Sequence, residues 1–359
     1  MLPRFRIDKL LPIRLTIDAF SSHEKSPADR ADDLRRIFRR HRPPIIVGDY
    51  IGSGGFSDVY AAESEYDDAQ EFALKALRMD LLKPRPGAGR DKEEMRIKDI
   101  KKRFTNESYV QWALSQHLSD RVSQSVVKVF DHGEFDRRRQ CRFILMERME
   151  STVREYVNDP ANHSNERDQL IYKTLLMTKI ADIILNVHQE GIIHRDIKPE
   201  NIFFYTSAGP RVGGKTASLS LRRRYDRDIR VKLGDFGTVR WVRTYSERFD
   251  GVIIGSQWYL SPEQFFDPEH VDTRTDIFSF GVVCYEILYG AHPKNVNADT
   301  GTKSLLQKLA WAKPQRRTPP KGFEELNEII FACMQNLDRR YQTMVEVVRD
   351  LRHFSRKLD

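Results

Sequence analysis

The chain has 359 residues, of which 40% are hydrophobic and 10% aromatic, so it carries enough apolar material for a core and is not a disordered chain. Its 60 Lys and Arg residues against 52 Asp and Glu residues give a net charge of +8, which indicates a well-solvated surface before it indicates a nucleic-acid-binding one. No apolar run reaches the roughly 18 residues that a membrane span needs. Charged residues also interrupt residues 1–20 before a signal-peptide core forms, so we expect a cytoplasmic protein.

Three cysteines stand far apart in the chain, at Cys141, Cys284 and Cys333. They are odd in number and none is arranged as a Cys-x-x-Cys pair. The spacing therefore predicts neither a disulfide framework nor a zinc site.

Residues 1–44 form an N-terminal extension that ends in a Pro43-Pro44 breaker. Apolar and polar residues alternate over residues 13–17, which predicts a short strand. A helix is expected after Ser26, because Pro27 suits the first helical position and apolar residues follow at helical spacing. Its arginine-rich face is expected to be solvated.

From residue 45 the pattern changes to short strands with one helix, at residues 103–118. The expected strands are residues 45–51, 58–62, 71–77, 126–130 and 142–147. Later segments have helical periodicity, at residues 170–188, 275–289, 323–336 and 341–357. Two turn-rich segments, residues 78–103 and 205–230, are interpreted as exposed, mobile insertions, the second of them basic.

The first segment with chemical character is a glycine-rich stretch that runs from Gly52 to Val59. Glycines let backbone amides approach a phosphate closely. A strand follows here, whereas a dinucleotide fingerprint or a Walker loop opens a helix, so this hairpin could lie over a nucleotide like a flap. A hairpin that merely turns the chain has the same sequence pattern.

Lys75 interrupts an otherwise apolar strand. A buried ammonium group needs an anionic partner, and Glu107 on the expected helix is the nearest suitable carboxylate. A lysine that reaches solvent from an edge strand is the alternative.

The strongest segment is His194-Arg195-Asp196-Ile197-Lys198-Pro199-Glu200-Asn201, followed by Asp235-Phe236-Gly237 after an apolar strand. Asp196 can accept a proton from an attacking hydroxyl, and Lys198 can hold a phosphoryl group. Asn201 and Asp235 can bind a metal ion. Phosphoryl transfer needs this set, because its chemistry is mostly positioning and charge neutralisation.

Three further motifs accompany these segments: Ala73-Leu74-Lys75, Ser261-Pro262-Glu263 and residues 276–281. Together the motifs stand in the order found in the eukaryotic-type (Hanks-type) protein kinases, which the chain resembles over residues 45–357. The resemblance implies an α+β, bilobal fold with its two lobes around one cleft. The N-lobe, residues 45–147, would hold a small antiparallel β-sheet with one helix. The C-lobe, residues 150–357, would be larger and mainly helical, with the basic loop 205–230 inserted in it.

The resemblance also implies a role for each matching residue. Lys75, paired with Glu107, would bind the α- and β-phosphates of ATP, Asp196 would be the catalytic base, and Lys198 would contact the γ-phosphate. Asn201 and Asp235 would bind Mg²⁺, with Mn²⁺ as a possible substitute. The nucleotide would be held by Gly52, Ser53, Gly54, Gly55, Phe56, Ser57, Val59, Ala73, Met146, Glu147, Met149 and Phe203. Two further positions would be structural: Glu263 paired with Arg340, and Asp276 bracing the catalytic loop.

Lys198 and Ser256 resemble the residues of Ser/Thr kinases, so protein Ser/Thr hydroxyls are the expected acceptors. Glu200 suggests a mild preference for basic peptides. Arg195 before the catalytic Asp suggests regulation by a phosphate on the activation segment, with Thr244 or Ser246 favoured as the autophosphorylation site.

Two departures from the family pattern leave alternatives open. Gln111 stands where an apolar residue is usual, so the helix could be loosened, or Glu107 could be one turn out of register. The insertion 205–230 is expected to be a solvated loop, with docking to an acidic partner or nucleic acid as the alternative.

Three other function classes compete with an active protein kinase. A pseudokinase or scaffold that binds protein partners is the runner-up, although Lys75, Asp196 and Asp235 are all present. A small-molecule kinase would share parts of the site, but Ser261-Pro262-Glu263 and the helical lobe argue against it. Nucleic-acid binding rests on basic patches without interleaved aromatic residues.

Overall fold

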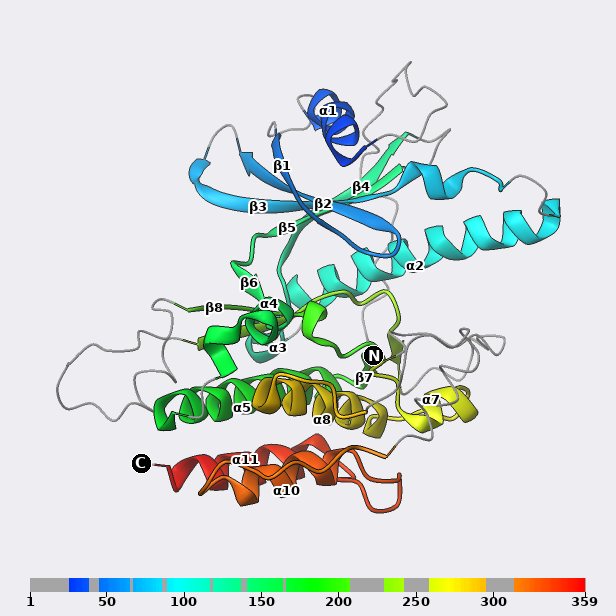
Figure 1. Ribbon diagram of the computed structural model, residues 1–359. Helices are drawn as coiled ribbons and strands as arrows, with labels where there is room; N and C mark the ends of the chain where they lie inside the picture. Colours follow the sequence, from blue (N-terminus) through cyan, green and yellow to red (C-terminus); the bar gives the residue numbers. More distant parts are fainter. Residues whose placement is uncertain are drawn as a thin grey trace. The chain divides into compact units, whose positions relative to one another are not determined.

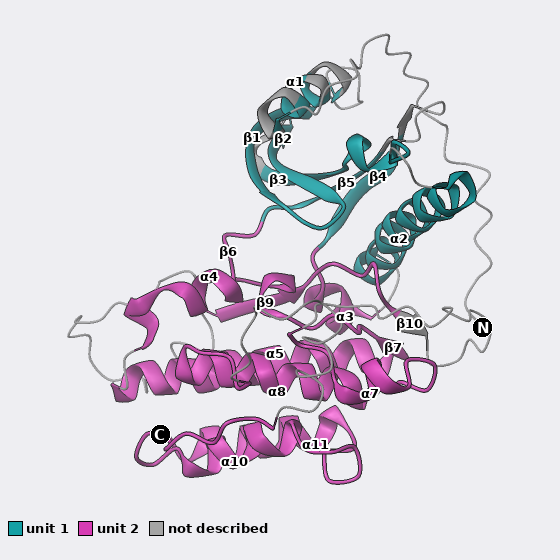
Figure 2. Cartoon of the chain, turned by 45° about the vertical axis from the view of Figure 1, so that its right-hand side comes forward, with its two compact units in different colours: residues 1–116, 128–148 teal, residues 117–127, 149–359 magenta. Residues whose placement is uncertain are grey.

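The computed structural model describes residues 26–38, 45–64, 67–85, 89–116, 119–136, 141–163, 166–206, 229–241, 258–294 and 313–358. The chain forms two compact units, shown in two colours in Figure 2. Unit 1 comprises residues 1–116 and 128–148, and unit 2 comprises residues 117–127 and 149–359. The predicted strand at residues 13–17 lies outside the described residues.

Unit 1 contains an antiparallel sheet with the strand order β1-β2-β3-β5-β4 (Figure 1). Its strands are β1 Ile45–Ser53, β2 Ser57–Ser64, β3 Asp67–Leu77, β4 Val129–Asp136 and β5 Cys141–Glu147. Each overlaps a predicted strand, although β4 begins three residues later than expected. In register across the sheet, Lys75 on β3 is paired with Val59 on one side and Ile144 on the other.

Helices cover both faces of this sheet. On one face, helix α1, Pro27–Phe38, buries Leu34 and Phe38 in one core with Tyr60 and Phe143, and the rings of Phe38 and Phe143 meet edge to face with centroids 5.0 Å apart. On the other face, helix α2, Arg90–Gln116, contributes Phe104 to a second core. The helix predicted in the extension is therefore present, and it is packed into unit 1.

The prediction for residues 78–103 was wrong for most of that segment. A short 3-10 helix, η2, spans Met79–Leu82, and α2 begins at Arg90. Ion pairs stabilise this first part of α2: Glu93 is buried and accepts from Arg96 at 2.7 Å and from the backbone N–H of Arg85 at 3.1 Å. A polar helix of this kind has no apolar stripe, so its periodicity was not visible in the sequence.

Unit 2 is mainly helical, as predicted. Helix α5, Arg167–Gln189, packs against α8, Arg274–Tyr289, and α11, Met344–Arg356, while α10, Glu324–Cys333, packs against α8 and α11. Among the described residues of this unit, the shorter helices are α3 Asp120–Ser125, α4 Val153–Asn158, η3 Pro160–His163, η4 Pro199–Asn201 and α7 Pro262–Phe266. The four long helices match the four predicted helical segments.

Short strands in unit 2 frame the segment that carries the HRDIKPEN and DFG residues. A three-stranded sheet has the order β6-β8-β9, with β6 Ser151–Thr152, β8 Ile202–Thr206 and β9 Ile229–Leu233. A second pair joins β7, Ile192–Ile193, to β10, Arg240–Trp241. Thr206 is paired with Ile229, so the described residues on either side of the basic insertion lie next to each other in one antiparallel pair. Residues 207–228 lie outside the described residues.

Two other sequence-based expectations concern cysteines and membranes. Cys284 and Cys333 are buried free thiols, and burial raises the pKa of each. Among the helices that the structure describes, none is both long enough and apolar enough to cross a membrane.

Candidate active site

In unit 1, Lys75 and Glu107 form an ion pair. The Lys75 side chain is 12% exposed and that of Glu107 is 7% exposed, so both charges are largely removed from water. β3 supplies the lysine and α2 the glutamate. The pairing shows that Glu107 is in the expected register, and it excludes both the one-turn shift and the unpaired lysine that the sequence had left open.

The glycine-rich turn lies between β1 and β2. The N–H of Gly54 donates to the Ser57 carbonyl at 2.8 Å, and Phe56 accepts from the N–H of Arg78 at 2.9 Å. A Cβ added at Gly52 or Gly55 would meet nothing within 4 Å, and neither residue has a φ in the left-handed region. Neither internal packing nor a left-handed turn therefore explains these glycines, which favours close approach of a ligand over a simple turn.

In unit 2, three side chains of the HRDIKPEN segment meet at Asp196. Lys198 donates from Nζ to Asp196 Oδ2 at 2.8 Å, and Asn201 donates from Nδ2 to the same oxygen at 3.1 Å and to the Asp196 carbonyl at 2.9 Å. Asp196 is 8% exposed. Two donors thus fix the orientation of the carboxylate, and both hydrogen bonds are accepted by the same oxygen, Oδ2.

The backbone brings Asn201 beside the Asp235 segment. Asn201 accepts at its carbonyl from the N–H of Gly234 at 3.0 Å, just before Asp235. Asp235 has a φ of +62°, an uncommon conformation for a non-glycine residue. A Cβ at Gly234 would lie 2.8 Å from the Phe203 ring, so any larger residue here would have to displace that ring. The predicted metal ligands Asn201 and Asp235 therefore belong to adjacent strand ends.

His194 and Asp276 hold the backbone of the same segment. Asp276 is fully buried and accepts from the N–H groups of His194 and Arg195 at 2.8 Å each, as the sequence predicted, and His188 donates to it at 2.9 Å. His194 Nε2 lies 3.1 Å from the Gly234 carbonyl, which makes Nε2 the protonated nitrogen. Burial lowers the pKa of His194, so the imidazole is neutral.

Comparison with known proteins agrees with this geometry. The Protein kinase domain family matches residues 45–350. The chain belongs to the protein kinase family. The bilobal protein-kinase fold, expected from the sequence, is consistent with the antiparallel sheet of unit 1 and the helices of unit 2.

Curated relatives are bacterial Ser/Thr protein kinases. The probable serine/threonine-protein kinase CE0033 of Corynebacterium efficiens is 29% identical over 327 residues, covering 86% of this chain and 41% of the relative. PrkC of Bacillus subtilis is 28% identical over 307 residues, covering 84% and 39%. Pkn2 of Myxococcus xanthus is 31% identical over 246 residues, covering 68% and 24%. The chain thus spans less than half of the length of each.

The family uses ATP and a divalent metal ion, and the residues present fit a hard cation. Asn201 and Asp235 offer an amide and a carboxylate oxygen, and the two Nδ2 hydrogen bonds of Asn201 to Asp196 fix the orientation of its amide. Among the described residues no group of three or more His, Cys, Asp or Glu side chains forms a metal cluster. One or two protein ligands together with substrate phosphates is the arrangement that Mg²⁺ prefers.

Near the expected hinge, Glu147 is tied to the start of β4. Its N–H donates to the Lys128 carbonyl at 2.9 Å, and its Oε1 accepts from the Lys128 N–H at 2.8 Å. The Glu147 side chain is therefore structural here, since it holds the end of β5 against the residue before β4. Met146 precedes it at the end of β5.

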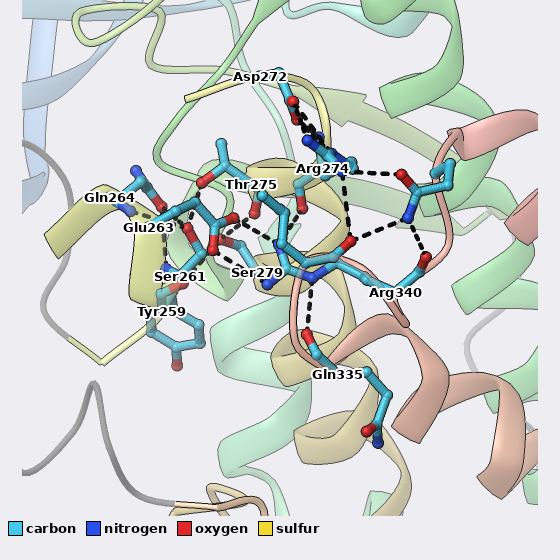
Figure 3. A network of polar contacts seen from close by, with 12 residues as sticks. Tyr259, Ser261, Glu263, Gln264, Asp272, Arg274, Thr275, Ser279, Gln335 and Arg340 are labelled. Atoms are coloured by element: carbon cyan, nitrogen blue, oxygen red, sulfur yellow. Dashed lines mark hydrogen bonds and ion pairs between the residues drawn. The ribbon is translucent and has the colours of Figure 1, made fainter. Parts of the chain in front are cut away.

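The Glu263–Arg340 pair is also present, in the network that Figure 3 shows. Arg340 donates to both carboxylate oxygens of Glu263, at 2.6 and 3.2 Å, and to the carbonyls of Gln335 and Arg274 at 3.0 and 2.8 Å. Ser261 begins α7 with a capping box to Gln264, whose side chain donates to the Arg195 carbonyl at 2.9 Å. The network thus connects α7 to the catalytic segment.

Sequence reasoning missed the residues that act on this segment from a distance, such as Gln264 and His188. Their contacts join positions 69 and 88 residues apart in the chain, and no local pattern marks them. Gly234 could have been found from its place directly before Asp235, although its close contact with Phe203 on β8 could not.

Proposed function

We propose that the chain is an ATP-dependent protein kinase that transfers the γ-phosphoryl group to Ser or Thr hydroxyls of protein substrates. The observation that carries this proposal is the Asp196 carboxylate, oriented by Lys198 and Asn201 and held beside the Asp235 segment. A pseudokinase or scaffold is not favoured, since none of the residues that the reaction needs is missing.

In this reaction Asp196 accepts the proton of the substrate hydroxyl, the hydroxyl oxygen forms a bond to the γ-phosphorus, and the bond to the leaving oxygen of ADP breaks. Lys198 neutralises charge on the phosphoryl group, and Lys75, held by Glu107, binds the α- and β-phosphates. A divalent cation, which we propose to be Mg²⁺ with Mn²⁺ as a substitute, supplies further neutralisation of phosphate charge. Asn201 and Asp235 are its proposed ligands.

The nucleotide contacts are also proposals. In unit 1 we assign the phosphates to the glycine-rich turn, which comprises Gly52, Ser53, Gly54, Gly55, Phe56 and Ser57. We assign the base to Val59, Ala73, Met146 and the Glu147 carbonyl of unit 1, and to Met149 and Phe203 of unit 2. The open space around Gly52 and Gly55 supports the first assignment.

We propose a kinase domain at residues 45–357, with an N-lobe at 45–147 and a C-lobe at 150–357, preceded by an extension at 1–44. Autophosphorylation of Thr244 or Ser246 is proposed to activate it through Arg195. Both hydroxyls lie outside the described residues, and Thr238, which lies within them, donates to the His194 carbonyl at 3.0 Å. Mass spectrometry of active protein tests this, and occupancy of neither site would overturn it.

The deciding experiment incubates the full chain with labelled ATP, Mg²⁺ and a panel of protein substrates, with Asp196→Asn as the comparison. We expect label on Ser or Thr from the wild type and at least about a hundredfold less from the variant, because proton transfer and positioning are lost. Circular dichroism checks that both proteins are folded. Equal inertness of the two folded proteins over the panel would favour the scaffold instead.

A further inference from the structure

A second polar cluster in unit 2 surrounds Arg154 on α4. Arg154 donates from Nε to Glu200 Oε1 at 2.7 Å, and its Nη2 donates to the Tyr259 hydroxyl and lies 3.4 Å from Glu286 Oε2. The Tyr259 hydroxyl donates in turn to Glu286 at 2.7 Å. One guanidinium group thus bridges two carboxylates from separate segments, η4 and α8.

The local structure fixes Arg154 in this position. Thr152 caps α4 with a capping box to Glu155, and Val153 and Tyr156 are buried on either side of the arginine. The arginine therefore extends from a short helix whose orientation is set by its cap and by its packing.

The cluster lies next to the residues proposed for catalysis. Glu200 directly precedes Asn201, whose side chain is bonded to the Asp196 carboxylate. The Glu200 side chain is 45% exposed and that of Arg154 is 25% exposed, whereas Glu286 is only 6% exposed. The two carboxylates thus form an acidic subsite that reaches the surface close to the proposed catalytic base.

Charge balance shows why the arginine matters. Burial raises the pKa of Glu286 and of Tyr259, so these groups resist becoming charged without a nearby cation. Burial also disfavours the charge of Arg154, but Tyr259 and the two carboxylates raise its pKa above the ordinary value. The positive charge that this acidic subsite requires is therefore already supplied from within the chain.

We propose that Arg154 is a specificity-determining residue: it fills the acidic subsite of Glu200 and Glu286 and so keeps a basic side chain of the substrate from binding there. This inference rests on the proposed function. It replaces the hypothesis from the sequence that Glu200 selects basic peptides. Removing the guanidinium would leave a subsite with the charge and the donor requirements that suit an arginine of the substrate.

The test uses the full chain and serine peptides that carry either arginine or norleucine at each of the four positions before the serine. We expect the wild type to use both kinds of peptide with kcat/KM values within about threefold. Arg154→Ala is expected to prefer the arginine peptide by about tenfold or more at one position, because charge-assisted hydrogen bonds to the vacated carboxylates become available. Adding Glu200→Gln to Arg154→Ala should remove most of that gain.

Glu200→Gln in the wild-type background tests the proposal without disturbing the buried part of the cluster. Since Arg154 is already paired with Glu200, the ratio of kcat/KM between the arginine and norleucine peptides should change less than twofold. If the wild type instead favours the arginine peptide by tenfold and Glu200→Gln abolishes that preference, the proposal is overturned, even if Arg154→Ala fails to fold.

Binding separates this proposal from the proposed function. The same peptides with alanine in place of serine, labelled with a fluorophore, report affinity by anisotropy without turnover. A gain in affinity for the arginine peptide in Arg154→Ala supports the subsite even if no phosphate is transferred, in which case only the proposed function fails. Identical affinities for both peptides in wild type and folded Arg154→Ala would overturn the inference and leave the proposed function intact.

Discussion

The Asp276 carboxylate accepts the backbone N–H of Arg195 at 2.8 Å while Arg195 has a φ of +67°. A left-handed conformation of a non-glycine residue costs about 1–3 kcal/mol and persists only where its surroundings impose it. Asp276 supplies that constraint, because its other oxygen accepts from the N–H of His194. One buried side chain on α8 therefore fixes the backbone immediately before Asp196.

Asp276→Asn should weaken both the fold and the proposed catalysis. An amide at this site offers one acceptor oxygen where the carboxylate offers two, and its NH₂ group would face a backbone donor. We expect the free energy of unfolding to fall by about 3 kcal/mol, measured by urea denaturation. Phosphoryl transfer should fall by about a hundredfold in the protein that remains folded, because the base is misplaced.

Asp272→Asn is the matched control for this prediction. Asp272 is also a multiple acceptor, with one hydrogen bond from the backbone N–H of Arg274 and three from its guanidinium group, but its side chain is 46% exposed. The same substitution at this residue should lower the free energy of unfolding by less than about 1 kcal/mol. Equal losses of stability in the two variants would show that Asp276 has no special role in the catalytic segment.

Arg340→Lys should destabilise unit 2 although it keeps the positive charge. The Arg340 side chain is fully buried, and its guanidinium donates to Glu263 with two nitrogens and to two carbonyl groups. A lysine has one nitrogen and cannot reproduce this planar fork. We expect a loss of about 2 kcal/mol or more in the free energy of unfolding.

The exposed pair Arg316–Glu328 provides the comparison for Arg340→Lys. Both of its side chains are about 60% exposed, at 60% and 61%. Arg316→Lys should change the free energy of unfolding by no more than about 0.5 kcal/mol. The prediction for Arg340 is wrong if the buried substitution is tolerated as well as the exposed one.

The long elements could be predicted because their sequence patterns are strong. α5, α8 and α11 bury apolar side chains at helical spacing, and the unit 1 strands are bounded by turn residues. The first part of α2 could not be predicted, since it is stabilised by ion pairs such as Arg96–Glu93. The two-residue strand β7 exists only because β10 pairs with it.

In the candidate site, too, local sequence patterns predicted some contacts and not others. Asp196, Lys198 and Asn201 were predicted because they lie within six residues of one another, and their side chains meet in the structure. Arg154 and Tyr259 are 105 positions apart in the chain, and no sequence pattern in either segment predicts their contact. Packing, not local pattern, decides which charged side chain reaches Glu200.

A pH dependence is expected from His292. Burial lowers its pKa, so the folded protein keeps this imidazole neutral below the ordinary value of 6.5, where the unfolded chain takes up a proton. Stability should therefore decrease as the pH falls through 6.5, by at most about 1.4 kcal/mol per pH unit for this group. His292→Gln should reduce that slope in urea denaturation between pH 6.5 and 5.5.

His270→Gln is the control for loss of an imidazole, because the His270 side chain is 77% exposed. Half-buried His132 and buried His194 also have lowered pKa values, so part of the slope should remain in His292→Gln. An unchanged slope in His292→Gln would contradict the assignment of a neutral, half-buried His292.

Phe38→Ala tests whether α1 belongs to unit 1 energetically. Phe38 is 1% exposed and shares a core with Tyr60 and Phe143, so truncation should lower the free energy of unfolding by about 3–5 kcal/mol. Ile46→Ala, at a side chain that is 53% exposed, should change it by no more than about 0.5 kcal/mol. Urea denaturation followed by circular dichroism measures both. If both substitutions lowered the free energy of unfolding by equal, small amounts, α1 would not contribute to the stability of unit 1. A large loss of stability in Phe38→Ala alone means that the folded N-terminal unit begins before residue 45.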